Sequence, residues 1–186
     1  MDLIFSKDSP RNATLSLPTG QPVYQIFTPD RWFHQEQTTI RKFQPGTSLP
    51  QDMGVIEIHS WSKSVVEVWG RSVLPKSAGV FKRGKIFTSS NGQQYTWKRK
   101  SRTAVLTDKL DNTMAVYDER RTNVFSRKEP SPAKLTIAPA AVEIADEIVG
   151  TFLYFEEQER RARSSAAASS SSAASASAAS AAAASC

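Results

Sequence analysis

Basic side chains around one predicted hairpin form the clearest candidate binding site in the sequence. Asn91-Gly92 favours a two-residue type I′ turn, because both central residues of that turn need positive φ. This turn would pair Lys85 with Lys98 across two strands. The members of the resulting basic face are Arg83, Lys85, Lys98, Lys100 and Arg102. Like charges directly opposite one another destabilise a ladder, so the face either extends its side chains into water or holds an anion.

The basic face depends on the register of the hairpin. The two-residue turn also pairs Thr88 with Tyr95 and Ile86 with Trp97, which gives the hairpin one apolar face. A type I turn with a bulge at Gly92 would shift the pairing by one residue and place Lys85 opposite Trp97. The five basic residues would then no longer share a face. A simpler interpretation is a solvated lysine face that protects a sheet edge.

The chain contains few residues that could bind a metal ion or act as an activated nucleophile. The two histidines, His34 and His59, lie in separate segments, and the one cysteine is Cys186, so a zinc or iron site has too few ligands. His59 and Ser60 are adjacent on a predicted strand and would point to opposite faces. The sequence contains no nucleophile elbow, Gly-rich phosphate loop or dinucleotide fingerprint. We expect neither a metal nor a cofactor.

Two other functions remain as alternatives. Glu143, Asp146 and Glu147 lie on one face of a predicted helix and could serve acid–base catalysis. Acidic residues in the first turns of a helix also stabilise it through its dipole, so we expect no enzyme. Stacking of single-stranded nucleic acid would need exposed aromatic side chains, whereas tryptophans on strands are usually part of the core. The candidates for stacking are Trp32, Phe33, Trp61, Trp69 and Trp97.

The elements that must position these residues are many short strands and one helix. A helix of Pro139 to Glu159 has an apolar half that includes Ile148, Phe152 and Phe155, and a polar half that includes the three carboxylates. The preceding residues alternate in short β-rich runs, as in a barrel or sandwich. The predicted strands are Asp2–Phe5, Ala13–Leu17, Pro22–Thr28, Gln37–Lys42, Gly54–His59, Val65–Trp69, Arg71–Leu74, Lys85–Ser89, Gln94–Lys98, Ala104–Thr107, Thr113–Asp118, Asn123–Phe125 and Lys134–Ile137.

Composition indicates one domain followed by a tail. Residues 1–163 carry the whole net charge of +6, from 24 Lys and Arg against 18 Asp and Glu. Residues 164–186 are Ser and Ala up to Cys186, and we expect them to be disordered. The chain has no signal-peptide pattern, and the apolar run of the helix is short and contains carboxylates. We therefore expect a soluble cytoplasmic protein in a reducing compartment, without a transmembrane segment.

Three stretches of the sequence carry a resemblance to a known family. They are Ile56 to Trp61, Phe87 to Lys98, and Ile148 to Glu156 followed by Arg160-Arg161. Within residues 1–163 the chain resembles a fungal domain family of unknown function in the tubby C-terminal-like superfamily. The resemblance implies an antiparallel barrel with the C-terminal helix packed in or against it. Its relatives include LURP-one-related proteins, phospholipid scramblases and tubby proteins, several of which act at membranes.

These observations lead to one functional hypothesis. We expect a non-enzymatic intracellular binding or scaffold domain that recognises anionic phospholipid through the basic face, with a membrane surface or a protein as partner. An enzyme using the helix carboxylates and a single-stranded nucleic-acid binder are the alternatives.

Overall fold

A computed structural model gives the fold of the chain. It describes residues 1–7, 9–29, 37–44, 46, 49–59, 62–79, 84–119 and 132–183, with side chains in the last helix up to Ala167. The predicted strand Asn123–Phe125 lies outside the described residues. Residues 1–154 form one compact unit and residues 155–186 a second.

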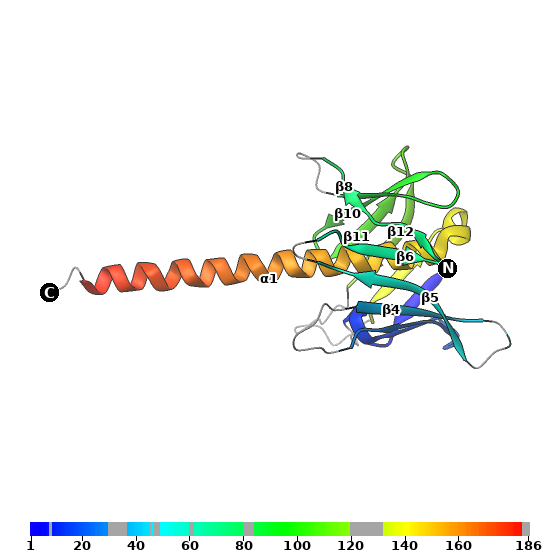
Figure 1. Cartoon of the computed structure of the whole chain (residues 1–186), viewed down its shortest axis with the longest axis horizontal. Helices are drawn as coiled ribbons and strands as arrows, with labels where there is room; N and C mark the ends of the chain where they lie inside the picture. The colour runs from blue at the N-terminus through cyan, green and yellow to red at the C-terminus, as the bar shows by residue number, and fades with distance from the viewer. Residues whose placement is uncertain are drawn as a thin grey trace, which may run out of the picture. The chain divides into compact units, whose positions relative to one another are not determined.

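The first unit is a single antiparallel sheet together with the beginning of one helix (Figure 1). Its strands are β1 (Asp2–Phe5), β2 (Thr14–Ser16), β3 (Pro22–Phe27), β4 (Gln37–Phe43), β5 (Pro50–Glu57), β6 (Val65–Val68), β7 (Arg71–Ser72), β8 (Lys76–Ser77), β9 (Lys85–Thr88), β10 (Gln94–Lys100), β11 (Thr103–Thr107), β12 (Thr113–Asp118) and β13 (Lys134–Ile137). The helical elements are η1 (Pro10–Asn12), η2 (Pro139–Ile144) and α1 (Ala145–Ala183).

The 13 strands form the order β7-β6-β5-β4-β3-β2-β1-β13-β12-β11-β10-β9-β8. The sheet therefore begins at β7 and ends at β8, and no strand pairing within the described residues joins these two ends. The prediction of a mainly β, antiparallel fold with a C-terminal helix is confirmed, whereas closure of the sheet into a barrel is not. We call the line between β7 on one side and β8 with β9 on the other the seam.

The seam arises where one short segment changes its partner. Val73 N donates to Val66 O at 2.9 Å, so the segment begins alongside β6. A few residues later Ala78 N donates to Gly84 O at 3.0 Å, which places it alongside β9. Pro75 lies between these two bonds and has no N–H with which to continue a ladder. The strand predicted at Arg71–Leu74 thus corresponds to β7, while β8 was missed.

The first turns of α1 are buried on every side. All residues from Glu147 to Tyr154 are buried, although the pattern of residues predicts a polar half for this stretch. Gly150 explains part of this close packing, because a Cβ at this position would lie 2.7 Å from Val68 Cγ2. Polar groups are satisfied inside the core: Trp97 Nε1 donates to Thr151 Oγ1 at 3.1 Å, and Thr151 Oγ1 donates to Glu147 O at 2.7 Å.

The bounds of the helix differ from those predicted. Pro139 to Ile144 form the 3-10 helix η2, and α1 continues past Glu159 through the Ser/Ala stretch to Ala183. Alanine has the highest helix propensity, which favours helical geometry in this stretch. Ala162 to Ala167 are exposed. The expectation that residues 164–186 are disordered in solution stays a prediction.

Phe152 is the aromatic centre of the core. Its side chain is fully buried, and its ring centroid lies 4.5 Å from that of Tyr117 and 5.6 Å from that of Trp97. We predict that Phe152→Ala lowers the free energy of unfolding by about 3–5 kcal/mol, because the helix would leave a cavity among β1, β10 and β12. Urea denaturation measures this change. The exposed Val142→Ala is the matched control, and equal midpoints for the two variants would contradict the assignment.

The tail generates a second prediction. An isolated helix rich in serine is marginal in water, so we expect the segment after Arg163 to add nothing to the stability of the folded domain. A chain that ends at Arg163 should unfold at the same temperature as the full chain, measured by calorimetry. A lower melting temperature for the shortened chain would show that the tail supports the domain.

Candidate functional site

The hairpin between β9 and β10 has the bulged register. Gly92 N donates to Ser89 O at 3.0 Å, and Gly92 has φ +77°. A type I turn followed by a glycine in the left-handed region is the three-residue loop of such hairpins. Lys85 consequently lies opposite Trp97, and Phe87 opposite Tyr95. The predicted pairing of Lys85 with Lys98 is wrong, and the alternative with a bulge at Gly92 is correct.

This register separates the predicted basic residues. Lys85 shares a face of the sheet with the buried Trp97, whereas Lys98 and Lys100 lie on the other face of β10. Lys98 Nζ pairs with Asp111 Oδ1 at 2.9 Å, and Arg102 lies in the turn after β10. Arg83 lies outside the described residues. Lys85 therefore does not share a face with Lys98 and Lys100.

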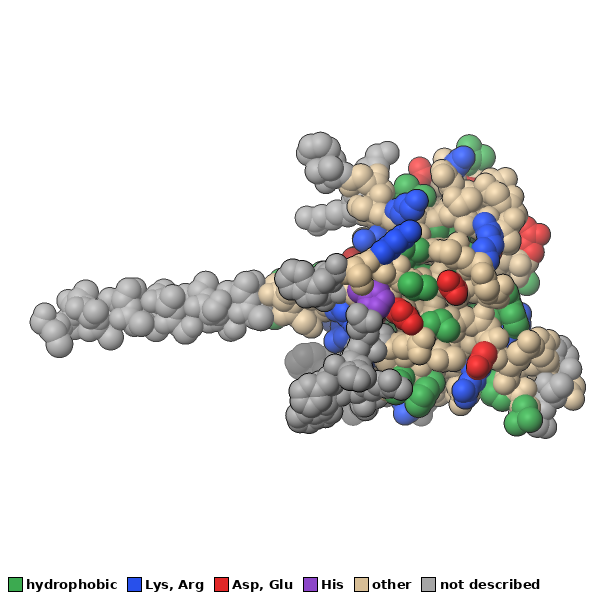
Figure 2. All heavy atoms as spheres, viewed as in Figure 1, with side chains coloured by type: hydrophobic (Ala, Val, Ile, Leu, Met, Phe, Trp, Pro, Cys, Tyr) green, Lys and Arg blue, Asp and Glu red, His purple; other side chains and the backbone are tan. Residues whose placement is uncertain are grey.

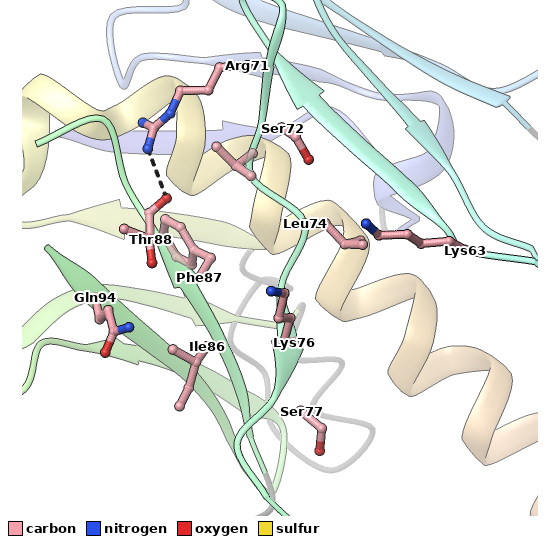
Figure 3. A pocket seen from close by; sticks show the side chains of 11 residues that line it. Lys63, Arg71, Ser72, Leu74, Lys76, Ser77, Ile86, Phe87, Thr88 and Gln94 are labelled. Carbon is pink, nitrogen blue, oxygen red and sulfur yellow. Dashed lines mark hydrogen bonds between the residues drawn. The ribbon is translucent and has the colours of Figure 1, made fainter. Parts of the chain in front are cut away.

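A cavity of about 460 Å³ lies at the seam instead (Figure 3). Its walls come from both ends of the strand order, because β7 contributes one side and β8 and β9 the other. The lining residues are Lys63, Arg71, Ser72, Val73, Leu74, Lys76, Ser77, Ile86, Phe87, Thr88 and Gln94. The lining thus combines three cations, several hydroxyl or amide groups, and apolar side chains.

The cavity carries an excess of positive charge. Among the described residues that line it, none is Asp, Glu, His or Cys. Lys63 and Lys76 make no ion pair or side-chain hydrogen bond in the described part of the chain, and both are exposed. In Figure 2, Lys and Arg side chains lie near β8, and Asp and Glu side chains lie near β6 and β5 on the same face. Two uncompensated ammonium groups in one cavity can attract an anion.

Arg71 differs from the two lysines because its charge is balanced. Arg71 Nη1 lies 2.9 Å from Glu147 Oε1, and Nη2 donates to Ser89 O at 2.7 Å. Glu147 is buried and also accepts hydrogen bonds from Ser89 Oγ and from Ser90 N, the latter at 3.0 Å. These donors occupy the carboxylate, so Glu147 acts as a structural anchor and has no free oxygen for proton transfer.

Asp146 is the second carboxylate at the beginning of α1, and it binds other strands. Its oxygens accept from Tyr24 Oη at 2.6 Å, from Lys42 Nζ at 2.7 and 2.8 Å, and from Trp69 Nε1 at 2.7 Å. Burial opposes ionisation, but the hydrogen bonds from Lys42, Tyr24 and Trp69 outweigh it and hold the pKa of Asp146 below its ordinary value. Burial, and then the charge of Asp146, raises the pKa of Tyr24.

The helix carboxylates considered for acid–base catalysis lie outside the lining of the seam cavity. Asp146 and Glu147 bind different groups, and neither lines the seam cavity. Glu143 Oε1 accepts a long hydrogen bond of 3.4 Å from Asn91 Nδ2. The part of the chain that the structure describes contains no group of three His, Cys, Asp or Glu that could hold a metal ion.

The other residues considered in the sequence are dispersed. Trp97 is buried, and Trp69 is 45% exposed in the turn with Gly70 between β6 and β7. Trp32, Phe33, Trp61 and His34 lie outside the described residues. His59 Nε2 lies 3.3 Å from Glu57 Oε2. Within the described ranges no helix is both long and apolar enough to span a membrane.

Sequence reasoning missed the three cations of the cavity. Lys63 precedes β6, Arg71 begins β7 and Lys76 begins β8, so they belong to three different elements. Pro75 was the one available signal, because a proline between two short runs predicts a break in strand pairing. It could predict the seam, although not which charges meet there.

A comparison with protein families matches residues 8–161 to the model of DUF6593, described as a family of unknown function. Searches of curated proteins and of solved structures gave no match. The function must therefore be argued from the geometry of this chain.

The network of Asp146 predicts how stability depends on pH. Its pKa is lower in the folded than in the unfolded chain, so its contribution is present above the ordinary value of 3.8 and is lost as pH falls through the folded value. Asp146→Asn should lower stability by about 2 kcal/mol at neutral pH, and this difference should shrink in acid. Urea denaturation at a series of pH values measures the effect.

The control for this prediction is Asp52→Asn. Asp52 forms an exposed ion pair with Arg41, with side-chain exposures of 71% and 42%, and such pairs contribute little. A difference for Asp146→Asn that stays constant from neutral to acid pH would contradict the role given to its charge.

Proposed function

We propose that this protein, which belongs to the DUF6593 family of unknown function, is a non-enzymatic domain that binds an anionic group in the seam cavity. One observation carries the proposal. Lys63 and Lys76 face a cavity that also contains Arg71, and no carboxylate lines it among the described residues. A bound anion would supply the missing counter-charge.

The composition of the cavity fits a phosphate-bearing headgroup. Lysine binds phosphate as a compact point charge, and the hydroxyl groups of Ser72, Ser77 and Thr88 can donate to further oxygens. A volume of about 460 Å³ lies within the range of roughly 300–1,000 Å³ that small-molecule sites occupy. Leu74 and Ile86 offer apolar surface for the part of the ligand that adjoins the headgroup.

Anionic phospholipid is the first ligand class to test. The net charge of +6 favours an anionic membrane surface. The resemblance to the tubby C-terminal-like superfamily supports this choice by analogy, because several of its members act at membranes. It also supports the proposal that the sheet closes into a tubby-like barrel around α1. The domain would then act in the cytoplasm and reach membranes reversibly.

The structural roles of the carboxylates favour binding over catalysis. Asp146 and Glu147 are held by hydrogen bonds from Tyr24, Lys42, Trp69, Arg71, Ser89 and Ser90. A general base needs a lone pair that can reach a substrate, and neither carboxylate offers one in the cavity. Of the two tryptophans in the described residues, Trp97 is buried and Trp69 is exposed, so this part of the chain offers one stacking platform for a nucleic acid.

Charge reversal in the cavity tests the proposal. The double variant Lys63→Glu/Lys76→Glu should lose binding to vesicles of phosphatidylcholine with phosphatidylserine or phosphatidic acid, measured by pelleting. Each basic residue near an anionic bilayer contributes about 1 kcal/mol, so removing two should weaken binding by about thirtyfold or more. Higher salt should weaken the wild type, since screening acts over about 8–10 Å.

Lys100→Glu/Lys109→Glu is the matched control. It makes the same change in net charge at two exposed lysines that do not line the cavity. We expect it to retain most of the binding. Equal losses for both double variants would show that net charge alone attracts the membrane, and full binding by Lys63→Glu/Lys76→Glu would exclude the seam cavity.

A further inference from the structure

Among the described residues no strand pairing joins the two sides of the seam, although the chain itself connects them through residues 73–75. Val73 N bonds to β6, so the alternation of a strand turns the main-chain groups of Ser72 and Leu74 toward the seam. On the opposite side Ser89 N donates to Gln93 O at 2.9 Å across the hairpin, which turns the main-chain groups of Thr88 toward the seam as well. Unpaired edges of this kind are the weakest part of a sheet.

The side chain of Arg71 crosses the seam. Arg71 extends from β7 and donates through Nη2 to Ser89 O at 2.7 Å and to Thr88 O at 3.4 Å, and Figure 3 shows the bond to Thr88. Further along, Lys63 stands on the β6 side and Lys76 on the β8 side of the same cavity. Their like charges repel, and because both side chains are exposed this repulsion is weak and favours separation of the two sides only slightly.

We propose that an anion in the seam cavity closes the seam, so that occupancy of the cavity and closure of the sheet are coupled. The proposal rests on the proposed function, because it assigns a consequence to the same site. A phosphate or phosphate monoester has enough acceptor oxygens to bind Lys63 from one side and Lys76 from the other at the same time. It would convert the repulsion across the seam into two attractions.

The coupling also reaches the buried helix. Arg71 lines the cavity and pairs with Glu147, whose other hydrogen bonds hold Ser89 and Ser90 at the end of β9. Any widening of the seam would pull Arg71 away from Ser89 O or from Glu147. An anion that holds the two sides together therefore protects this network, and a ligand that binds only the closed form shifts the population toward it.

Hydrogen exchange measures how firmly the segment 71–78 is held on each side of the seam. The reporters are the amides of Val73 and Ala78, which hold the segment 71–78 to β6 and β9. Inorganic phosphate and a short-chain phosphatidic acid serve as separate probes, so that a free phosphate and a lipid headgroup can be distinguished. At about 100 times its dissociation constant, a probe that requires the closed seam should slow exchange there by about 100-fold. The amides of β1 and β13 should not respond.

Neutral side chains should imitate the anion in part. Lys63→Gln/Lys76→Gln removes the repulsion, so exchange at Val73 and Ala78 should slow by roughly twofold to fivefold without any ligand. The same variant should no longer respond to phosphate. Lys100→Gln/Lys109→Gln, with the same change in charge, should exchange and respond like the wild type.

The outcomes separate this inference from the proposed function. Protection at the seam by either probe, together with slower exchange in Lys63→Gln/Lys76→Gln, supports the coupling. Binding of a probe in calorimetry without any change at Val73 and Ala78 overturns the coupling but leaves the proposed function standing. Absence of binding by both probes overturns the proposed function, and the inference with it.

Discussion

The structure depends on two adjacent carboxylates at the beginning of a buried helix. Asp146 binds Tyr24 on β3, Lys42 on β4 and Trp69 after β6. Glu147 binds Arg71 on β7 and the hairpin that follows β9. Successive residues of a helix point about 100° apart, so the two side chains reach different parts of the sheet. The beginning of α1 thereby connects strands from both ends of the strand order, which backbone pairing alone leaves open.

This arrangement explains how a helix with a polar half can lie in a core. Glu147, Thr151 and Tyr154 are buried with the apolar half, and the first two have defined hydrogen-bond partners. Burial of an unpaired carboxylate would be prohibitive, whereas one paired with a guanidinium and with main-chain amides is tolerated. The hydrogen-bonding capacity of Asp146 and Glu147 is therefore occupied by groups of the sheet. Positive charge remains at the seam, where Lys63 and Lys76 have no carboxylate partner among the described residues.

The seam combines a break in strand pairing with a cavity lined by cations. Pro75 prevents a continuous ladder, and the segment around it changes from β6 to β9. The resulting cavity contains donors and cations and, among its described lining residues, no acid. Sites that need to respond to a ligand are drawn from regions of low local stability. An anion bound in this cavity would therefore add stability where the strand pairing of the sheet is interrupted.

The sequence by itself determined the local features of this protein. Alternating apolar residues and turn signals predicted nearly all of the described strands, and the period of the apolar residues placed the helix around Ile148 and Phe152. The hairpin at Asn91-Gly92 was located, but its register depended on a choice between two turns that differ by one residue. Only the tertiary structure decided that choice, the burial of Glu147, and the meeting of Lys63, Arg71 and Lys76. Local patterns report on neighbours along the chain, whereas these contacts join residues whose distance in space is set by the whole sheet.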